Sequence, residues 1–221
     1  MDGGEAERRR QRGLVRSGYD AISTQYRDDQ GRPNPAGPES TDDYEAWLRE
    51  LAALLPPHAR VLDLGCGAGV PAARLLVNLG FWVTGVDISA VQVERARSLV
   101  PEATFIHADM SVWDCDPASF EAVVTLYALI HVPLPDQRHL FPRLRRWLVP
   151  GGYLLAIVGL ERWTGVEDYY GVQMFWDHAD TATYLNWLER AGFRPLWHRF
   201  IPEGPGGHTL VLARTDADEA R

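Results

Sequence analysis

The chain contains no lysine and only two cysteines, Cys66 and Cys115. Two cysteines are too few for a disulfide framework, so a reducing, cytoplasmic setting is expected. All 22 cationic residues are arginines, which we attribute to the codon usage of a GC-rich bacterial genome.

Positive charge and long apolar runs are also scarce. The formal net charge is −8, whereas a surface that follows nucleic-acid phosphates is basic, so no nucleic-acid partner is expected. The arginine cluster within residues 8–12 is the local exception and is expected to be a solvated terminus. No run reaches the roughly 20 apolar residues of a membrane helix. The N-terminal MDGGEAERRRQRG lacks the apolar core of a signal peptide, so no membrane association is expected.

The chain does have the alternation of short apolar runs and helical patterns that is typical of one α/β domain. Its 221 residues are 46% hydrophobic, which suits a single domain with a small cap. From ARVLDLGCG to YLLAIVG, strand-like and helix-like segments alternate, which predicts a mostly parallel sheet with helices on both faces. Only a Gly/Pro loop separates FRPLWHRFIPE from HTLVLAR. These two runs are therefore expected to pair antiparallel at the sheet edge.

Acidic residues stand at the ends of three successive predicted strands. Asp63 precedes Gly65 by two residues in VLDLGCGAG, Asp87 ends VTGVDIS, and Asp109 lies in IHADM. Ligands of open α/β sheets bind beyond the carboxyl ends of the strands, and glycines such as Gly65 and Gly67 allow close backbone approach. At these places Asp63 suits a cationic ligand, Asp87 suits ribose hydroxyls and Asp109 suits an exocyclic amine.

These motifs resemble a known family. Val70 stands where a dinucleotide fingerprint needs Gly or Ala, which disfavours a nucleotide-dependent oxidoreductase. The ordered set VLDLGCGAG, VTGVDIS, HADM, FEAVVTLYALIHV and LVPGGYLL resembles the class I S-adenosylmethionine-dependent methyltransferases, from Arg60 to Arg214. The resemblance implies a Rossmann-like α/β fold: a seven-stranded, mostly parallel sheet of order 3-2-1-4-5-7-6 with strand 7 antiparallel, helices on both faces and an N-terminal helical lid.

The resemblance also implies a division of the chain and a set of cofactor contacts. Residues 1–55 would form the lid or cap segment and residues 56–215 the S-adenosylmethionine-binding domain, with residues 160–180 as an insert at the substrate pocket. S-adenosylmethionine would be the methyl donor and S-adenosylhomocysteine the product; no metal is expected, because His and Cys lack ligand spacing. The residues assigned to the cofactor are Tyr19 and Tyr26 in the lid, Asp63, Gly65, Cys66 and Gly67 around the methionine portion, Asp87 at the ribose, and Ile88, Asp109 and Met110 at the adenine.

Catalytic residues are optional in this chemistry, because alignment of the acceptor with the activated methyl group supplies much of the rate. Tyr127 and His131, just past the fourth strand, and His178 within FWDHAD are the catalytic candidates. For His131, a loop-capping hydrogen bond is an equal alternative. Glu203 and His208 are expected near the same pocket rim, and a structural role is favoured for His208.

The segment YYGVQMFWDHAD is too polar for a core strand and too aromatic for an ordinary solvated loop. It is expected to form the acceptor wall through Tyr170, Met174, Phe175 and Trp176, with loop anchoring by Phe175 and Trp176 as the alternative. The expected activity is methylation of O, N or C on a small, aromatic or apolar metabolite in natural-product biosynthesis. The alternatives are methylation of a peptide or protein carboxylate, and a non-catalytic S-adenosylmethionine-binding partner protein. A monomer or homodimer is expected.

Overall fold

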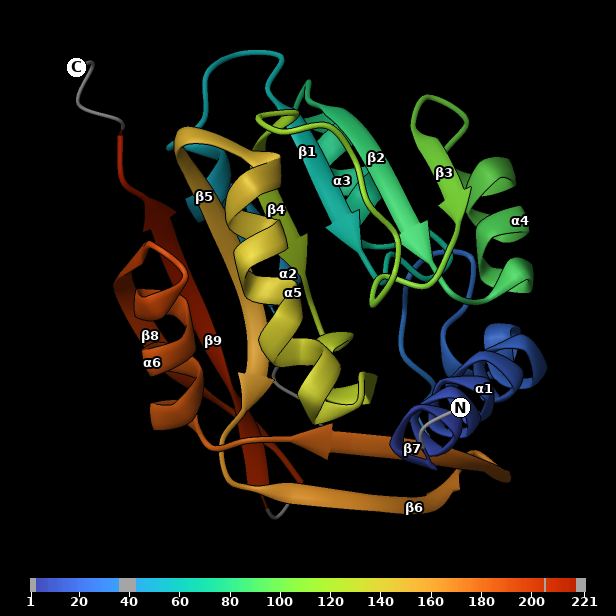
Figure 1. Cartoon of the computed structure of the whole chain (residues 1–221). Helices are drawn as coiled ribbons and strands as arrows, with labels where there is room; N and C mark the ends of the chain where they lie inside the picture. The colour runs from blue at the N-terminus through green and yellow to red at the C-terminus, as the bar shows by residue number, and fades with distance from the viewer. Residues whose placement is uncertain (1–2, 36–42, 205, 218–221) are drawn as a thin grey trace.

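The computed structural model describes residues 3–35, 43–204 and 206–217, and seven of its strands form one sheet of order β3-β2-β1-β4-β5-β9-β8 (Figure 1). These strands are β1 Arg60–Leu64, β2 Trp82–Asp87, β3 Thr104–His107, β4 Phe120–Thr125, β5 Leu148–Gly159, β8 Phe193–Glu203 and β9 Gly206–Thr215. Within this sheet β8 and β9 are the sixth and seventh strands, so the expected order 3-2-1-4-5-7-6 is confirmed. Strand β9 is antiparallel to both β5 and β8, as expected.

Helices cover both faces of the sheet because its strands are apolar on both sides; four of the five residues of β1 are buried. One core cluster joins α2 (Tyr44–Ala52), α3 (Ala72–Asn78) and α4 (Ala90–Leu99) to one face. A second cluster joins α5 (Leu134–Trp147) and α6 (Thr181–Arg190) to the other face, which is the front in Figure 1.

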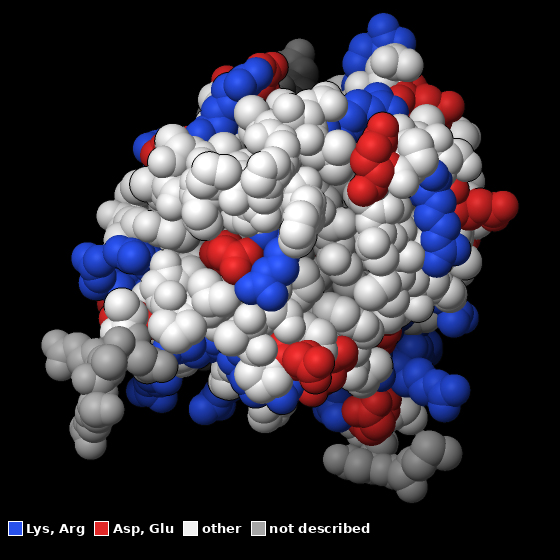
Figure 2. Space-filling model, turned by 90° about the horizontal axis from the view of Figure 1, so that it is seen from above, with Lys and Arg blue, Asp and Glu red and all other residues white. Residues whose placement is uncertain are grey.

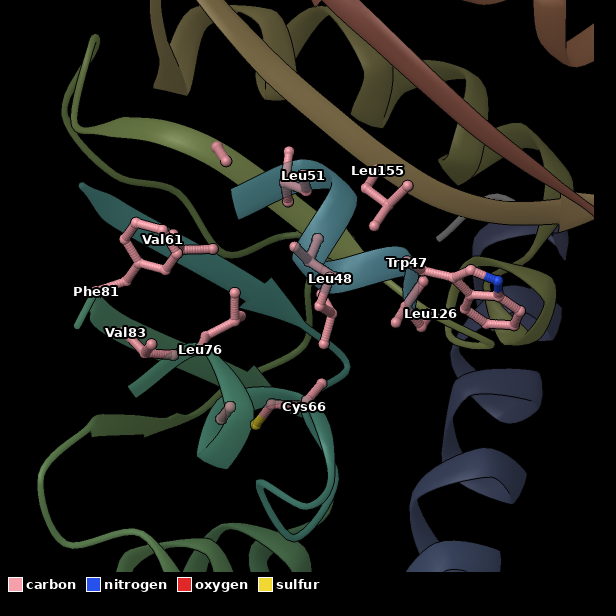
Figure 3. Close-up of a cluster of buried hydrophobic side chains, with 14 of the residues drawn as sticks. Trp47, Leu48, Leu51, Val61, Cys66, Leu76, Phe81, Val83, Leu126 and Leu155 are labelled. Carbon is pink, nitrogen blue, oxygen red and sulfur yellow. The ribbon is translucent and has the colours of Figure 1, made fainter. Parts of the chain in front are cut away.

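Helix α2 corrects the expectation that residues 1–55 form a lid. Leu48 and Leu51 are 0% and 1% exposed, and with Trp47 they pack into the same cluster as Val61 and Leu76 (Figure 3). Burying these side chains against the sheet makes α2 part of the domain core. Of the described lid residues, those of α1 (Gly3–Tyr26) lie across the carboxyl ends of the strands (Figure 1).

The expected insert is a β-hairpin of its own, made of β6 (Trp163–Tyr169) and β7 (Val172–His178), which forms a separate two-stranded sheet. Its loop residues Tyr170 and Gly171 both have positive φ, 53° and 83°, as the favoured two-residue turn requires. The hairpin lies beside α1 below the main sheet (Figure 1). The two pack closely at Gly18, where an added Cβ would stand 2.7 Å from Cε of Met174.

The face of the molecule opposite α1 and the hairpin is the one seen from above in Figure 2. Figure 2 shows that acidic and basic side chains are interspersed among uncharged ones on this face, at the top of Figure 1. Within the described part of the chain, none of the helices combines the length and the apolar character needed to cross a bilayer.

Candidate active site

A chamber, here called the inner chamber, lies between α1 and the carboxyl ends of β1, β2 and β4. Eight of the ten residues expected at the cofactor line it: Tyr19, Tyr26, Gly65, Gly67, Asp87, Ile88, Asp109 and Met110. The other two, Asp63 and Cys66, line an adjoining chamber that shares Gly65 and Gly67 with the first.

The glycine-rich turn after β1 is held by the end of β2. The N–H groups of Gly65 and Cys66 donate to the carbonyl of Val86 at 2.7 and 3.2 Å, and that of Gly67 donates to Oδ2 of Asp87 at 2.8 Å. A Cβ at Gly65 would come within 2.1 Å of Cβ of Ala128, and φ at Gly65 is +75°, so this position needs glycine. The side chain of Cys66 lies within the core cluster of Figure 3. Its backbone therefore faces the chamber in place of its thiol.

Asp63 is a buried carboxylate without a cation. Its side chain is 2% exposed, and among the described residues Oδ2 has no hydrogen-bond partner. Burial, together with the nearby charge of Asp87, raises the pKa of Asp63 to about 7. A carboxylate in such a place is stabilised by a positively charged group, so Asp63 fits the ammonium group of S-adenosylmethionine.

Asp87 is also buried but has two partners. Its Oδ1 accepts from the N–H of Ser89 and its Oδ2 from that of Gly67, both at 2.8 Å. Burial raises the pKa of Asp87, while these two donors act in the opposite direction. The carboxylate is thereby fixed at the chamber wall, where its remaining lone pairs can accept from ribose hydroxyls.

Arg12 of α1 was not predicted as a site residue, and the expected solvated terminus is wrong at this position. Its side chain is 12% exposed, and it lines the inner chamber. Its Nε lies 3.1 Å from Oδ2 of Asp109, and its Nη1 lies 2.5 Å from Oδ2 of Asp136. The carboxylate of Asp109, expected at the adenine amine, is therefore also an anchor for α1.

His131 lies in the short 3-10 helix η1 (Leu129–His131) with both ring nitrogens engaged. Its Nδ1 lies 2.7 Å from the carbonyl oxygen of Phe175 and therefore carries the proton, because a carbonyl only accepts. Its Nε2 lies 2.9 Å from the hydroxyl of Tyr19, which consequently donates. Burial lowers the pKa of His131 to about 4, so the ring is neutral near pH 7.

A second cavity, the outer chamber, lies beyond this pair, between α1, the β6–β7 hairpin and the end of the β8–β9 hairpin. It shares Tyr19, Tyr26, Tyr127 and His131 with the inner chamber. Its further lining residues include Tyr169, Tyr170, Trp176, His178, Glu203 and His208. The three catalytic candidates are thus brought to one cavity, and two of them stand at its border with the inner chamber.

The predicted acceptor wall needs a correction at Met174 and Phe175. Their side chains are 0% and 3% exposed, packed with Val15 and Ile22 of α1. They join the hairpin to the helix, which agrees with the anchoring alternative for Phe175. Tyr169 also lines the outer chamber but was not among the predicted site residues. It is the first residue of the aromatic segment YYGVQMFWDHAD, and that position was the signal that could have identified it.

Comparison with known proteins finds similarity to methyltransferases. Residues 61–152 match the family described as "Methyltransferase domain". The 27-O-demethylrifamycin SV methyltransferase of Amycolatopsis mediterranei is 39% identical over 129 residues, which are 51% of this chain and 47% of that protein. The trans-aconitate 2-methyltransferase of Paracidovorax citrulli is 40% identical over 109 residues, 48% of this chain and 41% of that one. The chain thus spans about half or less of the length of these relatives.

A solved structure shows the same fold. The Burkholderia thailandensis 1,6-didemethyltoxoflavin-N1-methyltransferase, with 1,6-didemethyltoxoflavin and S-adenosylhomocysteine bound, has a TM-score of 0.62 at 22% identity, covering 78% of each chain. The matched domain and the sheet order agree with the motifs in the sequence. Residues 61–152 thus match a methyltransferase domain, and the fold is that of solved S-adenosylmethionine-dependent methyltransferases.

Proposed function

We propose that this protein transfers the methyl group of S-adenosylmethionine to a small, aromatic or apolar metabolite. The observation that carries the proposal is the meeting of two chambers at one border, formed by Tyr19, Tyr26, Tyr127 and His131. The inner chamber fits the cofactor and the outer chamber fits an acceptor. When bound, the cofactor supplies a methyl group already activated by a sulfonium.

The inner chamber has a complementary group for each part of the cofactor. Asp63 would face the ammonium group and Asp87 the ribose. Ile88 and Met110 would contact the adenine from either side, with Asp109 at its amine. Asp63 is the best supported of these assignments, because a buried carboxylate without a partner is costly in the protein alone.

The outer chamber is suited to a flat acceptor because aromatic rings dominate its wall near the border. The ring of Tyr26 lies 6.0 Å from that of Tyr169 and 6.3 Å from that of Tyr170, and Tyr169 lies 5.3 Å from Trp176. Rings that are tilted or edge to face in this way bury apolar surface and leave faces for stacking. The rifamycin-related name of one relative supports a natural-product acceptor.

Within this proposal, His131 holds Tyr19 in place. Its Nε2 lone pair is used by the Tyr19 hydroxyl and its Nδ1 proton by Phe175. Tyr19 is therefore fixed at the border between the chambers. There its oxygen can accept a hydrogen bond from the substrate that receives the methyl group. His178 donates through Nδ1 to the carbonyl of Glu161 at 2.6 Å, which leaves Nε2 as an acceptor in the outer chamber.

The proposal is tested by calorimetric titration with S-adenosylhomocysteine and by transfer of labelled methyl groups to a metabolite extract. Asp87→Ala is expected to weaken binding about 10- to 100-fold, the effect of losing hydrogen bonds to a charged group. Asp116→Ala, at an exposed loop position, is the matched control and should bind as the unmodified protein does. Unchanged affinity of Asp87→Ala would refute the cofactor assignment. Binding without label transfer would favour a non-catalytic partner protein.

A further inference from the structure

The end of the β8–β9 hairpin brings a carboxylate and an imidazole together in the outer chamber. His208 on β9 pairs with Ile201 on β8, and Glu203 stands two residues further along β8. Side chains two residues apart in a strand share a face, so Glu203 and His208 point the same way. Nδ1 of His208 lies 2.8 Å from Oε2 of Glu203, and their side chains are 15% and 23% exposed.

This pair has unused hydrogen-bonding capacity. Among the residues that the structure describes, neither Nδ1 of His208 nor Oε2 of Glu203 forms an aligned hydrogen bond, although both atoms are buried. Within the same described ranges, no partner engages Nε2 of His208 either. Buried polar groups in this state are costly and are normally satisfied in the functional form of a protein. Nδ1 and Oε2 face each other, whereas Nε2 of His208 is open to a hydrogen bond from a ligand in the outer chamber.

The position of His208 relates it to the chamber border. Its ring packs edge to face on that of Tyr127, with centroids 5.3 Å apart, and Tyr127 lines both chambers. The other titratable groups around it are Glu203 on β8, His178 on β7, whose ring lies 6.2 Å away, and His131 on η1. Among these three histidines, His208 alone has a carboxylate beside Nδ1. The Nδ1 atoms of His131 and His178 instead donate to backbone carbonyls.

We propose that His208, oriented by Glu203, is the general base for an acceptor that carries an aromatic hydroxyl group. This inference rests on the proposed function and names its substrate class. The acceptor O–H bond breaks and its proton moves to Nε2 of His208. The oxygen uses the retained electron pair to bond the methyl carbon, while the C–S bond breaks and its electron pair stays on sulfur. The proton then leaves to water.

Each member of the pair has a distinct role. His208 is a catalytic residue, because it touches the acceptor proton, and imidazole is suited to a mildly acidic hydroxyl near neutral pH. Glu203 is a positioning residue: its carboxylate, 2.8 Å from Nδ1, favours the Nδ1–H tautomer and stabilises the imidazolium that forms, as carboxylates beside catalytic histidines do. The aromatic wall at Tyr169 and Trp176 would hold the plane of the same acceptor.

The test uses 4-nitrophenol, whose anion is coloured, as a probe of proton transfer in the full chain saturated with S-adenosylhomocysteine. Binding to the unmodified protein is expected to raise the ratio of phenolate to phenol about tenfold over the free probe, the effect of one charge-assisted hydrogen bond. His208→Asn should return the ratio to that of the free probe. Glu203→Gln should lower it and shift the pH profile of ionisation, and Glu203→Asp should restore both. His198→Asn, exposed on the same strand β8, is the control and should change nothing.

The outcomes separate this inference from the proposed function. A bound probe that stays protonated, a probe that does not bind, or equal effects of His208→Asn and His198→Asn would overturn the role of the pair while cofactor binding remained intact. Absence of S-adenosylhomocysteine binding would instead refute the proposed function. The ionisation of 4-nitrophenol would then still be measured on the protein without S-adenosylhomocysteine. His208→Gln serves as a second variant if His208→Asn fails to fold, as judged by its circular dichroism.

Discussion

Replacing Asp63 by Asn should make the protein without cofactor more stable at high pH, although it removes a site residue. The pKa of Asp63 in the folded state is about 7, compared with 3.8 for an ordinary aspartate, because the carboxylate is buried near Asp87. An unfolded chain therefore releases this proton near pH 4, whereas the folded chain retains it until about pH 7. Stability is lost progressively as the pH rises between these values and is constant above them.

The magnitude follows from the difference between the two pKa values. Each pKa unit corresponds to about 1.4 kcal/mol, so the raised pKa of Asp63 costs about 4 kcal/mol of folding free energy at pH 8 and about 2 kcal/mol at pH 5. Asparagine does not titrate, and its own packing cost is the same at both pH values. The free energy of unfolding of Asp63→Asn, relative to the unmodified protein, should therefore rise by about 2 to 3 kcal/mol from pH 5 to pH 8.

The assay is urea unfolding followed by tryptophan fluorescence at both pH values, with and without S-adenosylhomocysteine. S-adenosylhomocysteine should raise the free energy of unfolding of the unmodified protein. It should leave that of Asp63→Asn almost unchanged, because the ammonium group of the ligand no longer has a buried carboxylate to bind. Asp116→Asn is the control at an exposed position. A relative stability that is constant with pH, or that falls from pH 5 to pH 8, would refute the placement of an uncompensated charge at Asp63.

Three further predictions concern α1 and the hairpin beneath it. Arg12→Ala should weaken S-adenosylhomocysteine binding about three- to tenfold in calorimetry, because α1 loses half-buried ion pairs at the inner chamber. Arg10→Ala, which removes an exposed ion pair, should leave the affinity unchanged. Met174→Ala should lower the free energy of unfolding by about 2–5 kcal/mol in urea, whereas Val166→Ala, 41% exposed on the same hairpin, should change it by less than about 0.5 kcal/mol. Tyr19→Phe should cost about 1–3 kcal/mol in the same measurement, because it leaves a buried imidazole nitrogen without its donor, and an unaltered ¹⁵N shift of that nitrogen would contradict the contact.

The wall of the inner chamber could be predicted because its determinants are local. Asp63 and Asp87 lie within the last two residues of β1 and β2, and Asp109 lies two residues after β3. Parallel strands bring such ends to one edge of the sheet. The glycines at 65 and 67 are needed by the turn itself. Short spacing in the sequence therefore corresponds to short distances in space.

Arg12 at the inner chamber and the wall of the outer chamber depend on contacts between distant segments, which sequence periodicity does not specify. Arg12 meets Asp109 across 97 residues of chain (109 minus 12), and nothing near either residue marks the pair. Met174 and Phe175 were expected at the pocket because they are apolar and close to Trp176. Which side of β7 is covered depends on where α1 crosses it, and that crossing is fixed by packing at Gly18.

Helix α1 links the two halves of the site. Arg12 anchors it beside the adenine end of the inner chamber, and Tyr19 and Tyr26 reach the border with the outer chamber. The same helix buries Val15 and Ile22 against the hairpin that bears the aromatic acceptor wall. A displacement of α1 that admits the cofactor must therefore also move Tyr19 away from His131 and loosen the apolar contact with β7. In the proposed function, cofactor retention and acceptor recognition therefore depend on one packed unit, and substitutions in the α1–β7 contact should affect both even where they touch neither ligand.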